Sequence, residues 1–302
     1  MATLLELTAQ GDVATISDES HLANVKLMTP QQLYELWERQ NWQAHAIDLS
    51  KDVEDWAALP EEDRAEMVWG LSSFFVGEER VTTQFSGIVM SYEDQSEEAY
   101  LTTQQVDEAR HTQFFSRFYD EVIGTGGGID AQLERVREDL NDAFVTLFDE
   151  HLVDACKRLV ADPADARAKV DFVTTYHMVI EGILALTGQF FITDHLEKRG
   201  ILPGFVEGFK LISQDEHRHV AYGTWYLQRA TRDNPELARR VQDKLAELLP
   251  VAAGVLVPKG KDPFGEWELF GYTSAEVNEF AFRALTRRLK VIGIGLPEVS
   301  AA

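Results

Sequence analysis

The sequence has a single cysteine and few basic residues, and each shortage excludes a class of protein. Cys156 is the only cysteine among 302 residues, so the chain can form neither an internal disulfide nor a thiolate metal site. Lys and Arg total 28 against 51 Asp and Glu, a formal net charge of −23. Such acidity argues against binding to nucleic acid, whose phosphates need cationic side chains, and against an anionic membrane surface.

Long apolar runs are also missing from the sequence. No run approaches the roughly 20 apolar residues that cross a bilayer, so we expect no membrane span. The first residues include Glu6, Asp12 and Asp18 and lack the basic-then-apolar pattern of a signal peptide. With the lone cysteine, this indicates a cytoplasmic protein. Hydrophobic residues make up 45% of the chain, enough to fill a sizeable core.

Helix signals cover most of the chain. Thr29-Pro30 and Asn234-Pro235 are typical helix starts, Asp162-Pro163 breaks a helix and Gly200 ends one. The expected helices span about 30–41, 60–90, 96–122, 139–160, from after Pro163 to 199, 203–231, 235–249 and 274–289. Between them we expect an extended link (42–50), a glycine-rich loop (124–128) and a polar loop (259–267).

The same pass along the chain finds no convincing interior strand and no linker that would divide it. Apolar and polar residues alternate weakly in residues 1–28, which include Gly11-Asp12. We expect this stretch to form an N-terminal arm that is either a small hairpin or an irregular segment. The sequence therefore predicts an all-α protein in which residues 1–302 form one domain.

Two copies of Glu-x-x-His organise the chain. Glu108 and His111 form one, and Glu216 and His219 form the other, 108 residues later in both cases (216 − 108 and 219 − 111). Residues three apart share a helix face, so each copy projects a carboxylate and an imidazole together. The repeated spacing indicates two pseudo-symmetric halves of one site.

One further glutamate precedes each pair within an apolar helix face. Glu78 follows Phe74-Phe75-Val76-Gly77, and Glu181 follows Met178-Val179-Ile180. A carboxylate there is costly to bury unless it is paired or bound to metal. Two helices giving one Glu and two giving Glu-x-x-His form the ligand set of a di-metal carboxylate site in a helix bundle. These ligands suit Fe and Mn.

Neighbouring polar residues are candidates for supporting the ligands. Asp107 and Asp215 could accept the second N–H of the two histidines, and Arg110 and Arg218 could pair with those aspartates. Ordinary surface charge is the alternative for all four. Glu79 turns roughly 100° away from Glu78 and is expected to be solvated. The remaining histidines nearby are expected at the surface or behind the ligands: His177, His195 and His217.

At these residues the chain resembles the small subunit of class I ribonucleotide reductase, within the ferritin-like superfamily. The resemblance spans roughly residues 30–295, including Trp42–Ser50, which is similar to the segment that holds the tryptophan of the electron-transfer chain. Two features depart from a working reductase subunit. Phe115 stands where the radical tyrosine of the standard subunit lies, and the chain stops at Ala302, without the long docking tail.

A subfamily resembles the chain more closely: the ligand-binding oxidases with a mixed Mn/Fe centre. This resemblance implies Mn at Glu78, Glu108 and His111, and Fe at Glu181, Glu216 and His219, with Glu108 as the bridge. It also implies an ether link between Val81 and Tyr176, although both are plausible core residues. Five residues place Tyr176 about 140° from Glu181 on an ideal helix, so an irregular turn or a long reach is required.

The implied function is two-electron C–H oxidation driven by dioxygen, with a long-chain fatty acid whose carboxylate reaches the metals. Phe74, Phe85, Phe190 and Ile183 could line its tunnel or simply fill the core. A homodimer is implied, and a di-iron centre is possible. The alternatives are a tyrosine-free Mn/Fe reductase subunit that stores a radical for a partner, and a non-catalytic metal or lipid carrier.

Overall fold

The computed structural model describes residues 7–8, 11–12, 26–258, 260–263 and 265–297. Its α-helices are α1 (Pro30–Gln40), α2 (Ser50–Ala58), α3 (Glu61–Gln84), α4 (Ser86–Val89), α5 (Gln95–Phe118), α6 (Gly128–Val136), α7 (Asp142–Val145), α8 (Val153–Ala161), α9 (Ala166–Val173), α10 (Leu186–Arg199), α11 (Pro203–Thr231), α12 (Pro235–Val255) and α13 (Ser274–Ile292). Two 3-10 turns are η3 (Ala44–Ala46) and η5 (Arg137–Asp139), and three π-helical segments are η4 (Tyr119–Ile123), η6 (Thr146–Leu152) and η7 (Thr174–Ala185). The strands are β1 (Leu7–Thr8), β2 (Gly11–Asp12), β3 (Glu268–Leu269) and β4 (Tyr272–Thr273).

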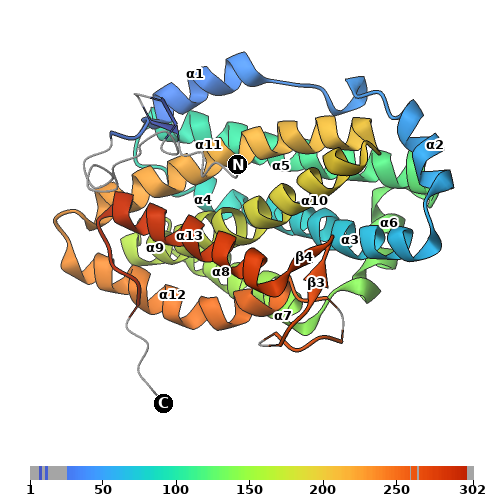
Figure 1. Cartoon of the computed structure of the whole chain (residues 1–302). Coiled ribbons are helices and arrows are strands. Elements are labelled where there is room, and N and C mark those ends of the chain that lie inside the picture. Colours follow the sequence, from blue (N-terminus) through green and yellow to red (C-terminus); the bar gives the residue numbers. More distant parts are fainter. Residues whose placement is uncertain (1–6, 9–10, 13–25, 259, 264, 298–302) are drawn as a thin grey trace.

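Four long helical segments form the centre of the molecule: α3, α5, the continuous run α9–η7–α10, and α11. Helix α3 packs on α5, α5 packs on α11, and α11 packs on η7. Helix α1 lies along α5 and α11 on one side, whereas α12 and α13 pack against η7 (Figure 1). The buried apolar side chains join into one cluster that extends from Leu33 to Ile294. The predicted all-α, ferritin-like bundle is confirmed.

Most predicted helix starts are confirmed because their capping residues act as expected. The Thr29 side chain accepts from the Gln32 amide and the Gln32 side chain accepts from the Thr29 amide, a reciprocal cap ahead of Pro30. Thr273 and Glu276 form the same cap on α13. At the other end, Gly200 terminates α10 in a left-handed conformation, with φ of 64°.

The continuous helical run Ala166–Arg199 is long and apolar enough to cross a membrane by length and composition. The sequence shows no unbroken apolar run here, because residues such as Thr175 and Glu181 interrupt it. Its apolar window is 94% buried inside the protein, as expected for the central helix of a bundle.

Several expected boundaries were wrong. The link after Trp42 contains the turn η3 and ends at Leu49, because α2 begins at Ser50, whose amide donates to Asp48. The helix expected at 139–160 begins only at Asp142, where the Asn141 side chain caps it, and it contains the π segment η6. Helix α12 continues six residues beyond the expected 249, to Val255, through an internal Pro250. Helix α6 was not predicted.

Two short hairpins complete the described chain. The strands β1 and β2 pair antiparallel around Gly11-Asp12, and the rest of the expected arm, up to residue 25, lies outside the described residues. The pair β3–β4 was not predicted. Its turn residues Phe270 and Gly271 both have positive φ, 53° and 78°. Tight hairpin turns are usually recognised in a sequence by Asn-Gly or Asp-Gly, so the Phe-Gly turn did not indicate a hairpin.

Candidate di-metal centre

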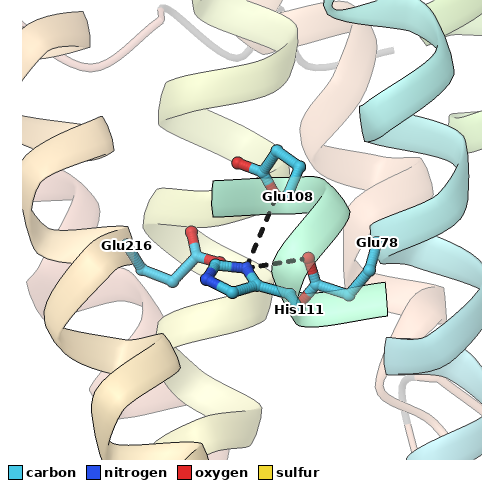
Figure 2. A group of neighbouring side chains, drawn as sticks. All are labelled: Glu78, Glu108, His111 and Glu216. Carbon is cyan, nitrogen blue, oxygen red and sulfur yellow. Dashed lines mark hydrogen bonds and ion pairs between the residues drawn. The ribbon is translucent and has the colours of Figure 1, made fainter. Parts of the chain in front are cut away.

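Four helical segments bring six ionisable side chains together at the middle of the bundle. Glu78 comes from α3, Glu108 and His111 from α5, Glu181 from η7, and Glu216 and His219 from α11. Their exposed fractions are only 0–5%. Figure 2 shows Glu78, Glu108 and Glu216 around the imidazole of His111. The structure therefore brings together all six residues that the sequence singled out as ligands.

One half of the cluster surrounds Nδ1 of His111. This nitrogen lies 3.2 Å from Glu78 Oε2, 3.6 Å from Glu108 Oε2 and 3.6 Å from Glu216 Oε1. One atom from each of these four residues lies within 4.8 Å of the others, close enough for a single ion to contact all four.

The other half surrounds Nδ1 of His219. This nitrogen lies 3.0 Å from Glu108 Oε1, 3.1 Å from Glu181 Oε1 and 3.6 Å from Glu216 Oε2. Glu108 and Glu216 thus offer one oxygen to each half. The sequence predicted a bridging role for Glu108, and in the structure Glu216 has the same position, shared by both ligand groups.

The second nitrogen of each histidine is held by an aspartate from the opposite motif. His111 Nε2 lies 3.1 Å from Asp215, and His219 Nε2 lies 3.2 Å from Asp107. Each aspartate sits next to a ligand glutamate on its own helix, yet orients the histidine of the other helix. An N–H donated to a carboxylate fixes the tautomer, so Nδ1 keeps its lone pair for a metal.

Two arginines and two tryptophans complete the support of these aspartates. Arg110 and Arg218 each pair with both Asp107 and Asp215. Trp42 Nε1 donates to Asp215 at 2.7 Å, and Trp37 Nε1 donates to Asp107 at 2.8 Å. The arginine pairing had been one of two open alternatives. Trp37 was not anticipated, because its partner lies 70 residues away in the chain.

Burial and repulsion between neighbouring carboxylates shift the pKa values of the four glutamates. Burial raises the pKa of Glu78 to about 8, and it also raises the pKa of Glu181 and Glu216, with neighbouring carboxylates adding to the effect. Glu108 behaves differently: burial opposes its ionisation, but His219 and His111 hold its pKa well below the usual value. The folded chain therefore lacks enough positive charge beside Glu78, Glu181 and Glu216 to offset the cost of ionising them.

Two divalent cations would supply that charge. The Oε2 atoms of Glu181 and Glu216 are buried and have no hydrogen-bond partner among the described residues. Unsatisfied oxygens of this kind are costly unless they bind an ion. The residues present therefore fit a pair of metal ions, with one imidazole and shared carboxylates for each.

The π-helical segment η7 explains how Tyr176 reaches the centre. Its hydrogen bonds run from residue i to i+5, which brings residues five apart closer to one helix face than an α-helix does. The Tyr176 hydroxyl donates to Glu108 Oε1 at 2.5 Å. Val81 lines a cavity together with Glu78 and Glu108. Both candidate crosslink residues therefore lie beside the ligand cluster.

Gln104 also belongs to this region and was missed from the sequence. Its side-chain amide lies 3.3 Å from Tyr176 Oη, from His177 Nε2 and from Glu181 Oε1. It precedes Glu108 by four residues, so helix periodicity could have placed it on the ligand face.

The other histidines and Glu79 are not among the six candidate ligands, and they differ in how deeply they are buried. His177 is fully buried against Tyr176, and burial lowers its pKa well below the usual value. His217 is buried beside the Ser213 carbonyl, and His195 lies 2.9 Å from the Phe270 carbonyl. Glu79 was expected to be solvated but is only partly exposed; it pairs with Arg80 and belongs to neither ligand group. Phe115, at the position of the radical tyrosine, is fully buried among aromatic rings.

A cavity of about 60 Å³ opens directly onto the ligands. Its polar lining includes Glu78, Glu108, Glu181 and Glu216. The rest of the lining is mostly apolar: Phe74, Gly77, Val81, Phe144, Phe148, Ile180, Leu184, Ala185, Val255 and Leu256.

Of the four residues suggested as tunnel lining, only Phe74 borders this cavity. Phe85 instead packs on Tyr176, and Phe190 stacks on Phe280. Ile183 is buried in the core outside the lining. Sequence identifies apolar residues near a ligand but does not tell which of their faces meets empty space.

A helix bundle that buries four carboxylates and two histidines on facing helices defines the class of ferritin-like di-metal carboxylate proteins. Within that class, the family model for the ribonucleotide reductase small chain matches residues 21–294. The chain belongs to this family.

Solved structures of an R2-like ligand-binding oxidase are similar over most of the chain. One variant with an aerobically reconstituted Mn/Fe cofactor is 26% identical, covers 89% of this chain and 94% of its own, and has a TM-score of 0.74. Another, also with an aerobically reconstituted Mn/Fe cofactor, is 25% identical, covers 89% and 97%, and has a TM-score of 0.76. The subfamily resemblance inferred from the sequence is confirmed.

Substitution of the shared carboxylates should affect both ions. We expect Glu108→Ala and Glu216→Ala each to lower the occupancy of both metal sites, because each residue contributes to both halves. Glu78→Ala should lower the occupancy of mainly one site. Elemental analysis after aerobic reconstitution with Mn(II) and Fe(II) measures this. Glu79→Gln is the matched control and should retain about two ions per chain. Full occupancy in folded Glu108→Ala protein would contradict the bridging geometry.

The metal-free protein should lose stability as pH rises. The pKa of Glu78 is about 8 in the folded chain against an ordinary value of 4.5, so the folded state binds more protons between those values. Unfolding then becomes easier with increasing pH in that window. The melting temperature should fall by roughly 5 °C or more between pH 5 and 8.

The metal-loaded protein is the control for this pH dependence. Bound cations replace the protons, so its melting temperature should change much less over the same range. A metal-free protein that is more stable at pH 8 than at pH 5 would show that folding does not raise the pKa of Glu78.

Proposed function

We propose that this protein is a dioxygen-activating oxidase that uses a mixed Mn/Fe centre to take two electrons from a C–H bond. The observation that carries the proposal is the buried cluster of four carboxylates and two imidazoles beside an apolar cavity. Such ligands suit Mn and Fe, and the similar R2-like oxidases carry an Mn/Fe cofactor. A di-iron centre at the same residues is the alternative composition.

In this proposal Glu78, Glu108 and His111 hold Mn, and Glu181, Glu216 and His219 hold Fe. Glu108 bridges the ions, and the position of its two oxygens between the histidines supports this role. When bound, the metal pair supplies the oxidising power by reaction with dioxygen. The protein supplies fixed imidazole tautomers, through Asp107 and Asp215, and excludes bulk water from a buried site.

The ligand in this proposal is a long-chain fatty acid or a similar apolar acid. Its carboxylate would approach the metals beside Glu78 and Glu181, and its chain would lie along the apolar wall formed by Phe74, Ile180 and Leu184. The cavity of about 60 Å³ is smaller than most small-molecule sites, so a long acyl chain would have to displace side chains of the apolar wall. The identity of the substrate is not part of the proposal.

The oxidase would also form an ether between the β-carbon of Val81 and the phenolic oxygen of Tyr176. One C–H bond and one O–H bond break and one C–O bond forms, so two electrons and two protons pass to the dioxygen-derived oxidant. The valine C–H has no acidic proton, and therefore acid–base groups alone cannot cleave it. The hydrogen bond from Tyr176 to Glu108 directs the phenol toward the centre and supports this role.

The main alternative is a radical-storing reductase subunit of the tyrosine-free Mn/Fe type. Phe115 is compatible with it, and so is the connection from Trp42 through Asp215 to His111, which could carry an electron. The apolar cavity at the ligands favours the oxidase, because a radical store needs no space for an organic substrate. A carrier without catalytic turnover is the weaker alternative.

The proposed setting is cytoplasmic, consistent with one unpaired buried cysteine. We propose that residues 1–302 form a single domain with 1–28 as its arm, that the protein is a homodimer, and that it binds neither nucleic acid nor a membrane. Dioxygen is the co-substrate.

The crosslink gives a direct test of the oxidase chemistry. Protein exposed to Mn(II), Fe(II) and air should yield tryptic peptides joined through Val81 and Tyr176, about two mass units lighter than their sum. Metal-free protein should yield only the separate peptides. Tyr176→Phe should abolish the link and retain both metals. Oxygen uptake without any link would favour the radical store over the crosslinking oxidase.

The bound ligand gives an independent test. Denaturing extraction followed by mass spectrometry should release a long-chain fatty acid from the purified protein. Ala185→Trp should reduce the amount, because Ala185 borders the cavity and indole would fill it. Ala185→Ser is the matched control with nearly unchanged volume. Equal lipid content in both variants, or none in the unaltered protein, would contradict an apolar ligand at this cavity.

A further inference from the structure

A second buried polar cluster lies next to the ligand cluster and is not used by the proposed chemistry. The Tyr222 hydroxyl donates to Glu97 Oε1 at 2.7 Å, and Lys169 Nζ lies 2.8 Å from the same oxygen. Tyr222 and Glu97 are fully buried and Lys169 is 2% exposed. A buried ion pair is seldom more stabilising than apolar residues of similar volume, so its position beside a phenol calls for another role.

Glu97 is placed to receive the phenolic proton. A phenol that loses an electron becomes strongly acidic, so it oxidises readily only when a base already accepts its hydrogen bond. Once Glu97 is protonated, Lys169 keeps three other partners: Glu93 at 3.7 Å, the Ser91 carbonyl at 2.8 Å and the ring of Tyr226 at 4.6 Å. The buried ammonium is therefore not left without support.

Closely spaced rings connect Tyr222 to the ligand cluster. The Tyr176 hydroxyl donates to Glu108, the rings of Tyr176 and His177 are 4.6 Å apart, and the rings of His177 and Tyr222 are 5.3 Å apart. All these side chains are buried. An electron can pass between Tyr222 and the centre through contacting side chains.

On its other side Tyr222 approaches the surface through Trp225. Their ring centroids are 5.9 Å apart, and Trp225 is only partly buried. The guanidinium of exposed Arg229 lies 5.2 Å from the Trp225 ring. A reductant in solution could deliver an electron to this exposed end.

Tyr222 has a proton acceptor that two other aromatic residues of this region lack, whereas Tyr176, whose hydroxyl donates to Glu108, is consumed by the proposed crosslink. The ring of Tyr100 lies 5.6 Å from Tyr222, but its buried hydroxyl has no hydrogen-bond partner among the described residues. Phe115 has no hydroxyl. Of Tyr100, Phe115 and Tyr222, it is therefore Tyr222 that can lose an electron and a proton together.

We propose that Tyr222 is a redox-active residue that gives one electron to the oxidised metal centre and its phenolic proton to Glu97. The centre is reduced by one electron, the Tyr222 O–H bond breaks, an O–H bond forms on Glu97, and no other bond changes. A soluble one-electron reductant of the ascorbate class then restores Tyr222 through Trp225, and the proton returns from Glu97. The inference rests on the proposed oxidase function and adds a route by which an oxidised centre without substrate is discharged.

The test is freeze-quench electron paramagnetic resonance of Mn(II)/Fe(II)-loaded protein mixed with dioxygen, with oxygen uptake measured on the same sample. We expect a tyrosyl radical signal that narrows in protein labelled with ring-deuterated tyrosine. Tyr222→Phe should lose the signal, and Tyr100→Phe, the matched control, should keep it. Glu97→Gln should also lose it, because the proton acceptor is gone. Metal content and circular dichroism confirm that each variant is loaded and folded.

The outcomes separate this inference from the function on which it rests. Oxygen uptake with no tyrosyl signal, or with a signal that survives Tyr222→Phe, overturns the role of Tyr222 and leaves the oxidase standing. Absence of oxygen uptake overturns both. If Glu97→Gln fails to fold, the comparison of Tyr222→Phe with Tyr100→Phe still decides the result.

Discussion

The constraint on which the structure depends is the burial of four carboxylates around two imidazoles. In a low-dielectric interior such a group is tolerable only with compensating charge and complete hydrogen bonding. The protein meets part of this need itself: Asp107 and Asp215 orient the histidines, and Arg110 and Arg218 neutralise the aspartates. The remaining negative charge is what makes the site a receptor for cations.

Departures from regular helix geometry concentrate around this cluster. The segment η7 carries Tyr176, His177 and Glu181, and η6 contributes Phe148 to the cavity wall. π-helical turns shift side chains relative to an α-helix and are common at functional sites. Here the shift in η7 brings a phenol to the oxygen of a proposed bridging ligand, which an α-helix of the same sequence would direct elsewhere.

The surroundings of the cluster differ by direction, and this asymmetry organises the proposed chemistry. The apolar cavity lies on one side, where a substrate could meet the metals. Trp42 and Trp37 connect through aspartates to the two histidines on another side. Tyr176 on η7 connects through His177 to Tyr222 on α11, which leads to Trp225. Substrate binding and electron supply would therefore use separate parts of one bundle.

The sequence by itself determined most of the helices and the candidate ligand set, because both depend on local spacing. Glu-x-x-His places two ligands on one helix face wherever that helix packs, and caps such as Thr29 with Gln32 act within one turn. Only the tertiary structure decided the rest. The crosswise pairing of His111 with Asp215, the second shared carboxylate at Glu216, and the contact of Trp37 with Asp107 all join residues far apart in the chain. Likewise Phe74 lines the cavity whereas Phe85 and Phe190 pack elsewhere, because packing of whole helices determines which side of an apolar residue faces a void.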